Sequence, residues 1–394
     1  MGSYVIGIGV ISAIGNNVEE NFESLVSKRT GISALTHFST SHDVPVGQIN
    51  LINDQLKEML GLPSGKTYSR TALLGMVAVK EALRDAGVDP HSGLRIGLIS
   101  STSAGGMDLS ENFYVEMKNK EDGGRLRDVV SHDCGDSTEQ IASALGIHGF
   151  LSTISTACSS SANALMLADR LLNHDQLDVV VAGGIDPLCK FTINGFNSLM
   201  ILDKELCRPF DSTRAGLNLG EAAGFLVLQR EKPKNGKFYC RLAGYANAND
   251  AYHQTATSPN GDGPFLAMSG ALKRAGLSPE DVDYVNVHGT GTGNNDQSEG
   301  MAMRRLFGEK MPRFSSTKVY TGHTLGAAGG IEAVYSALAI SRDVIFPTFN
   351  FKNRIEELAM DPETEVIPHA GVKVVMSNSF GFGGNVSSLV FSAE

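Results

Sequence analysis

A pattern that occurs twice in the chain constrains its fold more than any other feature of the sequence. Residues 81–105 (EALRDAGVDPHSGLRIGLISSTSAG) are echoed by residues 270–293 (GALKRAGLSPEDVDYVNVHGTGTG). Each copy is typical of a helix, a turn, a strand and a loop of Ser, Thr and Gly. Two further pairs follow in the same order, residues 156–168 with 321–333 and residues 178–187 with 372–384. Three pairs in one order predict two similar halves that face each other.

Short apolar runs predict strands that are covered on both faces. They occupy residues 4–10, 95–100, 150–156, 178–182, 224–230, 284–288, 314–320, 372–377 and 387–392. Helical patterns lie between them, as in residues 69–86. This alternation is typical of α/β proteins with largely parallel sheets. We expect an α/β chain whose halves span residues 1–233 and 234–394, with their sheets as central layers.

Charge and composition exclude several classes of function. Lys and Arg number 33 against 43 Asp and Glu, so the formal net charge is −10. A nucleic-acid partner would need a basic face, which this balance argues against. No apolar run is long enough to span a membrane, and the opening MGSYVIGIGV reads as a core strand rather than a signal peptide. The five cysteines, an odd number, then predict reduced thiols and a cytoplasmic location.

Cys158 is the candidate nucleophile. It follows a predicted strand and precedes small and then apolar residues in STACSSSANALML. This setting places the thiol at the first turn of a buried helix, where free N–H groups and the helix dipole favour a thiolate. The other cysteines lack this setting and are expected to pack as small apolar side chains; they are Cys134, Cys189, Cys207 and Cys240.

Two histidines have settings that match the nucleophile. His288 ends the apolar run YVNVH, and His323 lies in STKVYTGHTLGAAGG. In the repeat, His323 holds the position of Cys158, so facing halves would bring the imidazole to the thiol. Lys318 precedes His323 and Glu332 follows it, and a nearby lysine favours a neutral imidazole. Three other histidines are expected to be structural: His91, His253 and His369.

A glycine turn near the end, NSFGFGG at residues 378–384, could present backbone N–H groups to an anion, as an oxyanion hole does. Cofactor motifs are incomplete. Gly7 and Gly9 follow a strand, but Ser12 stands where the dinucleotide fingerprint requires glycine. Neither a phosphate loop nor His and Cys residues at metal-ligand spacing occur, so we expect no metal site and no cofactor.

Together these residues resemble the β-ketoacyl-[acyl-carrier-protein] synthases, Cys-His-His condensing enzymes of the thiolase superfamily. The matching motifs run through almost the whole chain: TACSSS and residues 208–224, 250–259, 288–299, 315–333 and 377–385. The resemblance implies a thiolase-like fold with α-β-α-β-α layers. It also implies an acyltransferase that needs no cofactor and that condenses an acyl group with malonyl-[acyl-carrier protein] to give 3-oxoacyl carrier and CO2.

The resemblance implies a role for each matching residue. Cys158 would carry the acyl group, His288 and His323 would promote decarboxylation of the malonyl unit, and Lys318 would orient His323. The implied oxyanion hole consists of the N–H groups of Cys158 and Phe382. The other implied residues are Phe196, Leu325 and Phe382 in the acyl pocket, Asp296, Glu299 and Glu332 in a supporting shell, and Lys66 and Arg70 in carrier docking.

Three departures from the family pattern concern the substrate. Gly293 replaces the proline of a T-x-T-P-x-N-D loop, and the sequence after the glycine turn reads Gly384-Asn385-Val386 where the family has G-T-N. The segment between Phe196 and Arg208 is also shorter than is typical. Primary fatty-acid elongation and a specialised polyketide or polyene lipid pathway both stay open.

Other classes of protein match the sequence less well. A biosynthetic thiolase needs a second cysteine near the C-terminus, where the last here is Cys240, and a type III synthase has Asn in place of one histidine. A non-catalytic chain-length factor keeps the fold but loses the nucleophile, and the trio alone would also suit a Cys-His hydrolase. We expect a homodimer along the sheet edge of the first half, with a heterodimer as the alternative. Since carrier and chain are both acidic, docking requires a local basic patch.

Overall fold

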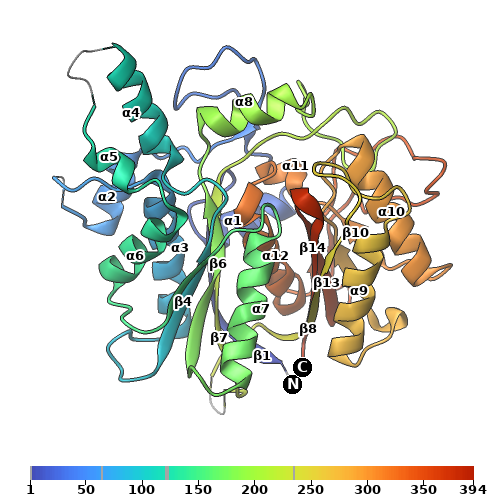
Figure 1. The fold of residues 1–394 in the computed structure, drawn as a ribbon. Coiled ribbons are helices and arrows are strands. Elements are labelled where there is room, and N and C mark those ends of the chain that lie inside the picture. The colour runs from blue at the N-terminus through green and yellow to red at the C-terminus, as the bar shows by residue number, and fades with distance from the viewer. Residues whose placement is uncertain (1, 64, 120–123, 234–235) are drawn as a thin grey trace.

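The computed structural model describes residues 2–63, 65–119, 124–233 and 236–394 (Figure 1). Its centre is a ten-stranded sheet with the order β10-β9-β13-β14-β8-β1-β7-β6-β4-β5. The strands are β1 (Ser3–Ser12), β4 (Ile96–Ser101), β5 (Leu151–Ile154), β6 (Val179–Asp186), β7 (Ala222–Gln229), β8 (Cys240–Asn249), β9 (Tyr284–Asn286), β10 (Arg313–Ser315), β13 (Val374–Phe380) and β14 (Asn385–Ser392). Two small sheets pair β2 (Ile32–Ser33) with β3 (Val46–Gly47) and β11 (Val344–Ile345) with β12 (Ile367–Pro368).

The ten strands form two sets of five with the same arrangement. The set β5-β4-β6-β7-β1 and the set β10-β9-β13-β14-β8 each begin with three parallel strands and end with two antiparallel ladders. Among the described residues, the strand pairing that joins the two sets is that of Ser3–Val5 of β1 with Cys240–Leu242 of β8. This repetition confirms the α/β fold of two related halves. The predicted boundary after residue 233 adjoins residues 234–235, which lie outside the described part of the chain.

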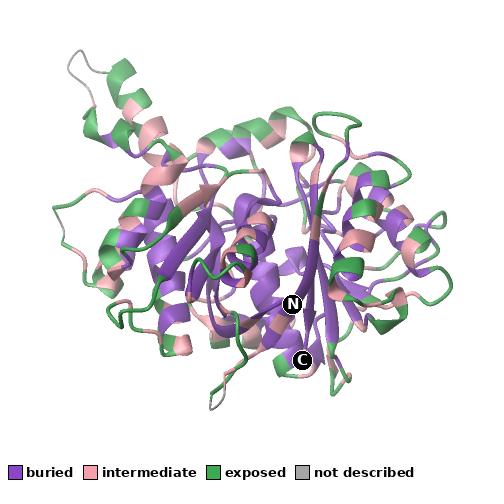
Figure 2. Ribbon diagram, turned by 60° about the horizontal axis from the view of Figure 1, so that its bottom comes forward, coloured by how far each residue is buried: buried purple, intermediate pink, exposed green. Residues whose placement is uncertain are grey.

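Helices cover both faces of each set of strands. In the first half α3 (Arg70–Ala86) packs on β1 and β7. In the second half α9 (Asp262–Ala275) packs on β8 and β14. Between the sets lie α7 (Ser160–Asn173) and α12 (Ala328–Ser341), as Figure 1 shows. The layers are therefore α-β-α-β-α, and Figure 2 shows buried residues concentrated in the strands and central helices. The remaining α-helices are α1 (Val18–Val26), α2 (Asn53–Leu60), α4 (Met107–Asn119), α5 (Arg127–Val130), α6 (Cys134–Leu145), α8 (Lys190–Ser198), α10 (Gly293–Phe307) and α11 (Lys318–Thr321).

The repeat is also visible in how equivalent helices end. The Ser69 side chain accepts the N–H of Ala72 and caps the start of α3. Helix α3 ends at Gly87 and α9 at Gly276, with φ angles of 64° and 71°. This left-handed conformation favours glycine at a helix C-terminus. The two glycines occupy matching positions in the sequence repeat, so the same turn leads each half into its next strand.

Three expectations about the strands were wrong. The predicted strand at 314–320 ends at Ser315, and Lys318–Thr321 form the helical turn α11 instead. Buried β-branched residues fit either conformation, so composition could not separate the two. Strand β8 was missed because its small and polar residues make no continuous apolar run. The sheet is mixed rather than largely parallel, since β7 and β14 run antiparallel to both of their neighbours.

Candidate active site

Equivalent bends place the thiol and an imidazole against each other at the junction of the halves. Cys158 lies between β5 and α7, directly before the N-cap residue Ser159. The residue before it, Ala157, has a φ of 54°, and Gly322, the residue before His323, has a φ of 72°. The two positions match in the repeat, and both bends turn the next side chain toward the centre. The Nε2 atom of His323 lies 3.0 Å from the Cys158 sulfur.

His288 completes the group of three. It follows β9, and its ring lies 5.2 Å from the His323 ring, centroid to centroid, at an angle of 87°. All three side chains are buried. The structure therefore brings together the nucleophile and both histidines that the sequence singled out.

Burial, rather than the helix dipole, controls the thiol. Exclusion of solvent raises the pKa of Cys158 to about 12, and the opposing effect of Lys318 is smaller. The expectation of a favoured thiolate was wrong, because Cys158 precedes the N-cap and is fully enclosed instead of lying within the first turn of α7. The thiol is neutral at rest, so it must lose its proton as it reacts, and the nearest acceptor is His323.

Both imidazoles are neutral. Burial is the largest cause that holds the pKa values of His288 and His323 well below 6.5, and the charge of Lys318 lowers both further. Lys318 is itself buried and forms an ion pair with the carboxylate of Glu332. A neutral imidazole carries one N–H donor, which suits a carbonyl oxygen that becomes negative.

The glycine turn reaches the nucleophile backbone to backbone. The N–H groups of Phe382 and Cys158 both face the Cys158 sulfur. A Cβ atom on Gly381 would lie 2.9 Å from the carbonyl oxygen of Thr156 and 3.2 Å from the Cys158 nitrogen. Only a residue without a side chain allows this approach. The N–H groups of Phe382 and Cys158 therefore lie close enough to the sulfur to lower the pKa of Cys158 slightly.

Buried carboxylates hold the loop that carries His288. Glu299 accepts the N–H groups of His288 and Gly289, both at 2.8 Å. Asp296 accepts those of Phe210 at 2.8 Å and Gly291 at 3.2 Å. Burial raises the pKa of Glu299 to about 7 and raises that of Asp296 as well. These contacts, with the Lys318–Glu332 pair, place all three supporting residues around the site.

A cavity of about 150 Å³ opens onto the three reacting side chains. Phe196 of α8 and Phe382 stack across it, with ring centroids 5.7 Å apart and 18° between their planes. Leu325, expected in this lining, packs instead in an apolar cluster with Leu217 and Phe196. The cavity is lined by Cys158, Phe196, Ile201, Leu217, His253, Thr255, Ala256, Thr257, His288, Thr290, Thr292, Gly293, Asn294, Asn295, His323, Phe380, Gly381, Phe382, Gly383 and Gly384.

Sequence reasoning missed several of these residues. Thr290 and Thr292 border the cavity because their loop directly follows His288, a signal that was present in HGTGTG. His253, expected to be structural, is exposed and borders the cavity instead. It belongs to a loop whose Gln254 carbonyl accepts the N–H of Gly383 at 2.7 Å. That contact joins segments far apart in the chain, so the sequence carried no sign of it.

The two predicted docking cations have different surroundings. Lys66 is exposed, with its amino group 5.0 Å from the centre of the Tyr68 ring. Arg70 is buried, and its guanidinium lies 2.6 Å from the carboxylate of Glu221 and donates to the Leu51 carbonyl. The prediction for Arg70 was wrong, because a cation inside an ion pair of the core cannot meet a partner at the surface.

A fold of two α/β halves with a thiol and two imidazoles in one cavity defines a condensing enzyme of the thiolase type. Comparison with protein families agrees. The N-terminal domain of the β-ketoacyl synthases matches residues 4–234, and their C-terminal domain matches residues 239–352. The chain therefore belongs to the β-ketoacyl synthase family.

Relatives cover the whole chain. It is 33% identical to 3-oxoacyl-[acyl-carrier-protein] synthase 2 of Staphylococcus aureus, over 98% of this chain and 100% of that protein. The corresponding enzyme of Vibrio cholerae is 32% identical, over 98% of both chains. Among solved structures, the Xenorhabdus doucetiae ketosynthase ApeO in complex with its chain length factor ApeC is 32% identical with a TM-score of 0.87, over 100% and 98% of the chains. The ishigamide ketosynthase/chain length factor has a TM-score of 0.92 at 26% identity, over 100% and 99%.

Proposed function

We propose that this protein condenses an acyl group held on Cys158 with malonyl-[acyl-carrier protein], releasing CO2 and forming 3-oxoacyl-[acyl-carrier protein]. The observation that carries the proposal is the 3.0 Å contact between the thiol and His323 beside a second neutral imidazole. Family membership and the names of the full-length relatives support the same reaction. The product belongs to fatty-acid or polyketide synthesis.

The first step transfers the acyl group to the enzyme. The Cys158 sulfur attacks the carbonyl carbon of a carrier-bound thioester while the thiol proton passes to Nε2 of His323. The N–H groups of Cys158 and Phe382 hold the negative oxygen that forms. The carbon–sulfur bond to the carrier then breaks, and the departing carrier thiolate takes the proton from His323. A neutral thiol beside a neutral imidazole suits this order of events, because neither group is charged before the substrate binds.

The second step makes the new carbon–carbon bond. For this step His323 takes the neutral tautomer that carries its proton on Nε2, the nitrogen that faces Cys158. His288 and His323 then donate N–H groups to the thioester oxygen of the malonyl unit, so electrons from the breaking carbon–carboxylate bond collect there as an enolate. CO2 leaves, and the enolate carbon attacks the acyl carbonyl. The bond to Cys158 breaks, and the thiolate takes a proton from water. Lys318 keeps both imidazoles neutral donors because its charge disfavours their protonation.

A direct test uses purified protein with acyl and malonyl carriers. We expect a 3-oxoacyl carrier that is two carbons longer than the starting acyl group. Free acid as the only product would identify a hydrolase and overturn the proposal. Cys158→Ala should take up no acyl group. A non-catalytic chain-length-factor role is not favoured, because the nucleophile and both histidines are present and in contact.

We further propose a cytoplasmic homodimer that pairs along β5. This strand ends one edge of the sheet, and Phe150 and Leu151 are 42% and 38% exposed there. An open apolar strand edge favours pairing with another strand.

No helix within the described ranges is long and apolar enough to cross a membrane. A sedimenting species of twice the chain mass would support the homodimer, whereas a monomer that pairs only with a related subunit would favour the heterodimer.

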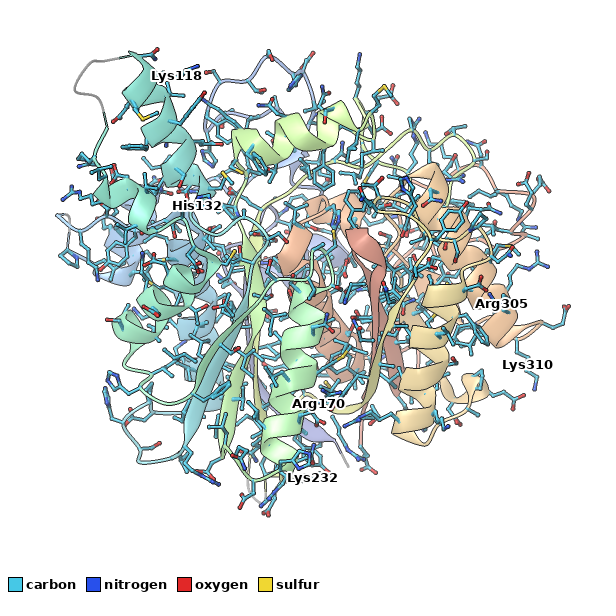
Figure 3. The ribbon with its side chains drawn as sticks, in the orientation of Figure 1. Lys118, His132, Arg170, Lys232, Arg305 and Lys310 are labelled. Atoms are coloured by element: carbon cyan, nitrogen blue, oxygen red, sulfur yellow. The ribbon has the colours of Figure 1, made fainter. Side chains whose placement is uncertain are left out.

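Docking of an acidic carrier is assigned to Lys66, with nearby cations in support. Arg125 and Arg127 are more than half exposed, although both lie near Asp128. Figure 3 shows Lys118 at the far end of α4, with Arg305 and Lys310 on the opposite side of the molecule. The latter two already contact Asp262 and Glu280. Lys66→Glu should raise KM for the carrier and leave kcat unchanged. An unchanged KM would show that Lys66 is not part of the surface that docks the carrier.

A further inference from the structure

Asn385 stands where the chain departs from the family pattern, and it contacts both segments that carry the oxyanion donors. It begins β14, directly after the glycine turn. Its backbone carbonyl accepts the N–H of Gly381 at 2.8 Å, which closes the turn around Phe382. Its side-chain oxygen lies 2.6 Å from the hydroxyl of Ser159, the residue that follows the nucleophile.

Further contacts hold that side-chain oxygen in place. It accepts the amide groups of Asn163 at 2.9 Å and Asn247 at 2.7 Å. The Ser159 hydroxyl lies between this oxygen and the carbonyl oxygen of Thr156, the latter at 2.7 Å. Ser159 is fully buried. One amide oxygen therefore links β14, β8, α7 and the turn that precedes Cys158.

The link matters because the two N–H donors come from segments far apart in the chain. Gly381 allows the turn to approach Thr156 and Cys158 closely. The missing side chain does not itself fix the distance between the two N–H donors, however. Asn385 joins the two segments through its backbone on one side and its side chain on the other. An oxyanion hole is effective only when both donors stay aimed at the developing charge.

We infer that Asn385 is a positioning residue that sets the separation of the Cys158 and Phe382 N–H donors through its contact with Ser159. The inference rests on the proposed function. Asn385→Ala should slow acyl transfer from carrier to enzyme by about ten- to hundredfold, less than the loss of a whole donor. Ser159→Ala removes the other end of the link and should slow the same step.

The test compares four proteins: wild type, the two single variants and the double variant. Acyl uptake is followed by intact mass, and alkylation of Cys158 by iodoacetamide is measured in parallel. Alkylation uses the thiol but no oxyanion hole, so it should change by less than about twofold in Asn385→Ala. The double variant should be no slower than the slower single variant, because both substitutions break one link. Asn247→Ala, which removes one exposed donor to the same oxygen but leaves its contact with Ser159, is the matched comparison and should slow acyl uptake much less than Asn385→Ala does.

Several results would overturn the inference. They are an Asn385→Ala variant with wild-type acyl uptake, a double variant whose losses multiply, or alkylation that falls in parallel with acyl uptake. The last would indicate general loosening of the site, as would an equal loss in Asn247→Ala. If Asn385→Ala does not fold, Ser159→Ala and its alkylation rate decide the question. A wild type that takes up no acyl group overturns the proposed function as well, so the two failures are distinguishable.

Discussion

The buried pair of Lys318 and Glu332 gives a prediction whose size follows from the structure. Side-chain exposures are 3% and 1%. Burial raises the pKa of Glu332 to about 7 although Lys318 opposes the rise. Replacement by methionine, Lys318→Met, removes that opposition, so the carboxyl must titrate at a higher pH. A raised folded-state pKa contributes stability that is present at low pH and is lost as the pH rises through the folded value.

The cost of Lys318→Met therefore depends on pH. Below about pH 7 the carboxyl is protonated in both folded proteins, and its proton contributes equally to their stabilities. Above this pH the Glu332 carboxyl ionises in the folded wild type, whereas in the folded variant it must keep its proton. Each pH unit then costs the variant about 1.4 kcal/mol relative to wild type. The stability difference should grow by about 1 kcal/mol from pH 7 to 8, where the wild-type carboxyl is still partly protonated. It should grow by about 1.4 kcal/mol from pH 8 to 9, until the carboxyl of the variant ionises.

Urea unfolding of both proteins at pH 6, 7, 8 and 9 measures this difference. The double variant Lys318→Met/Glu332→Leu is the matched control, because it removes both charges and with them the growth above pH 7.

Activity separates the effect of Lys318 on the imidazoles from its effect on Glu332. Without Lys318 the pKa values of both imidazoles rise, so the acidic limb of the pH–rate profile should move to higher pH in single and double variants. A stability difference that stays constant from pH 6 to 9 would refute the reasoning.

Three further predictions concern the reacting groups. Because the pKa of Cys158 is about 12, its alkylation rate should rise about tenfold per pH unit from pH 7 to 10, and a plateau near pH 8 would contradict the buried thiol. His288→Ala should abolish decarboxylation but slow acyl uptake by less than about threefold, whereas His323→Ala should slow both by about a hundredfold or more; a His288→Ala variant that loses both steps equally, or a His323→Ala variant with normal acyl uptake, would contradict the assigned roles. Gly381→Ala pushes a Cβ against Thr156 and should slow acyl uptake about a hundredfold with Cys158 still alkylated, and normal uptake would show that the turn can move away.

The sequence was sufficient to predict the contact between Cys158 and His323, because it depends on a repeated local bend. Ala157 and Gly322 turn the chain in the same way at matching positions, so alignment of the halves was enough to pair the next residues. The burial of Arg70 could not be foreseen. Its partner Glu221 lies 151 positions away, and an isolated arginine reads as a surface cation unless that partner is known. The domain boundary at residue 233 stays a prediction.

The thiol pKa shows a different limit of sequence reasoning. A strand, a turn and a helix do place Cys158 near free N–H groups, and in an open site this would favour the thiolate. The outcome depends on whether water reaches the sulfur, which is decided by the packing of both halves and not by the local motif. Here burial outweighs the nearby lysine and N–H groups.

The same burial explains how a site without a resting thiolate can react. Neutral thiol and neutral imidazoles occupy an enclosed cavity, so an N–H donor there acts on a developing oxyanion or enolate with little competition from water. Solvent exclusion thus makes the resting thiol a weaker nucleophile. It also makes the N–H donors more effective at stabilising the oxyanion and the enolate that form during the reaction. The balance holds only if proton transfer to His323 accompanies attack, which the 3.0 Å contact allows. It follows that a variant with a more acidic Cys158 but displaced Phe382 and Cys158 N–H groups would alkylate faster and condense more slowly than wild type.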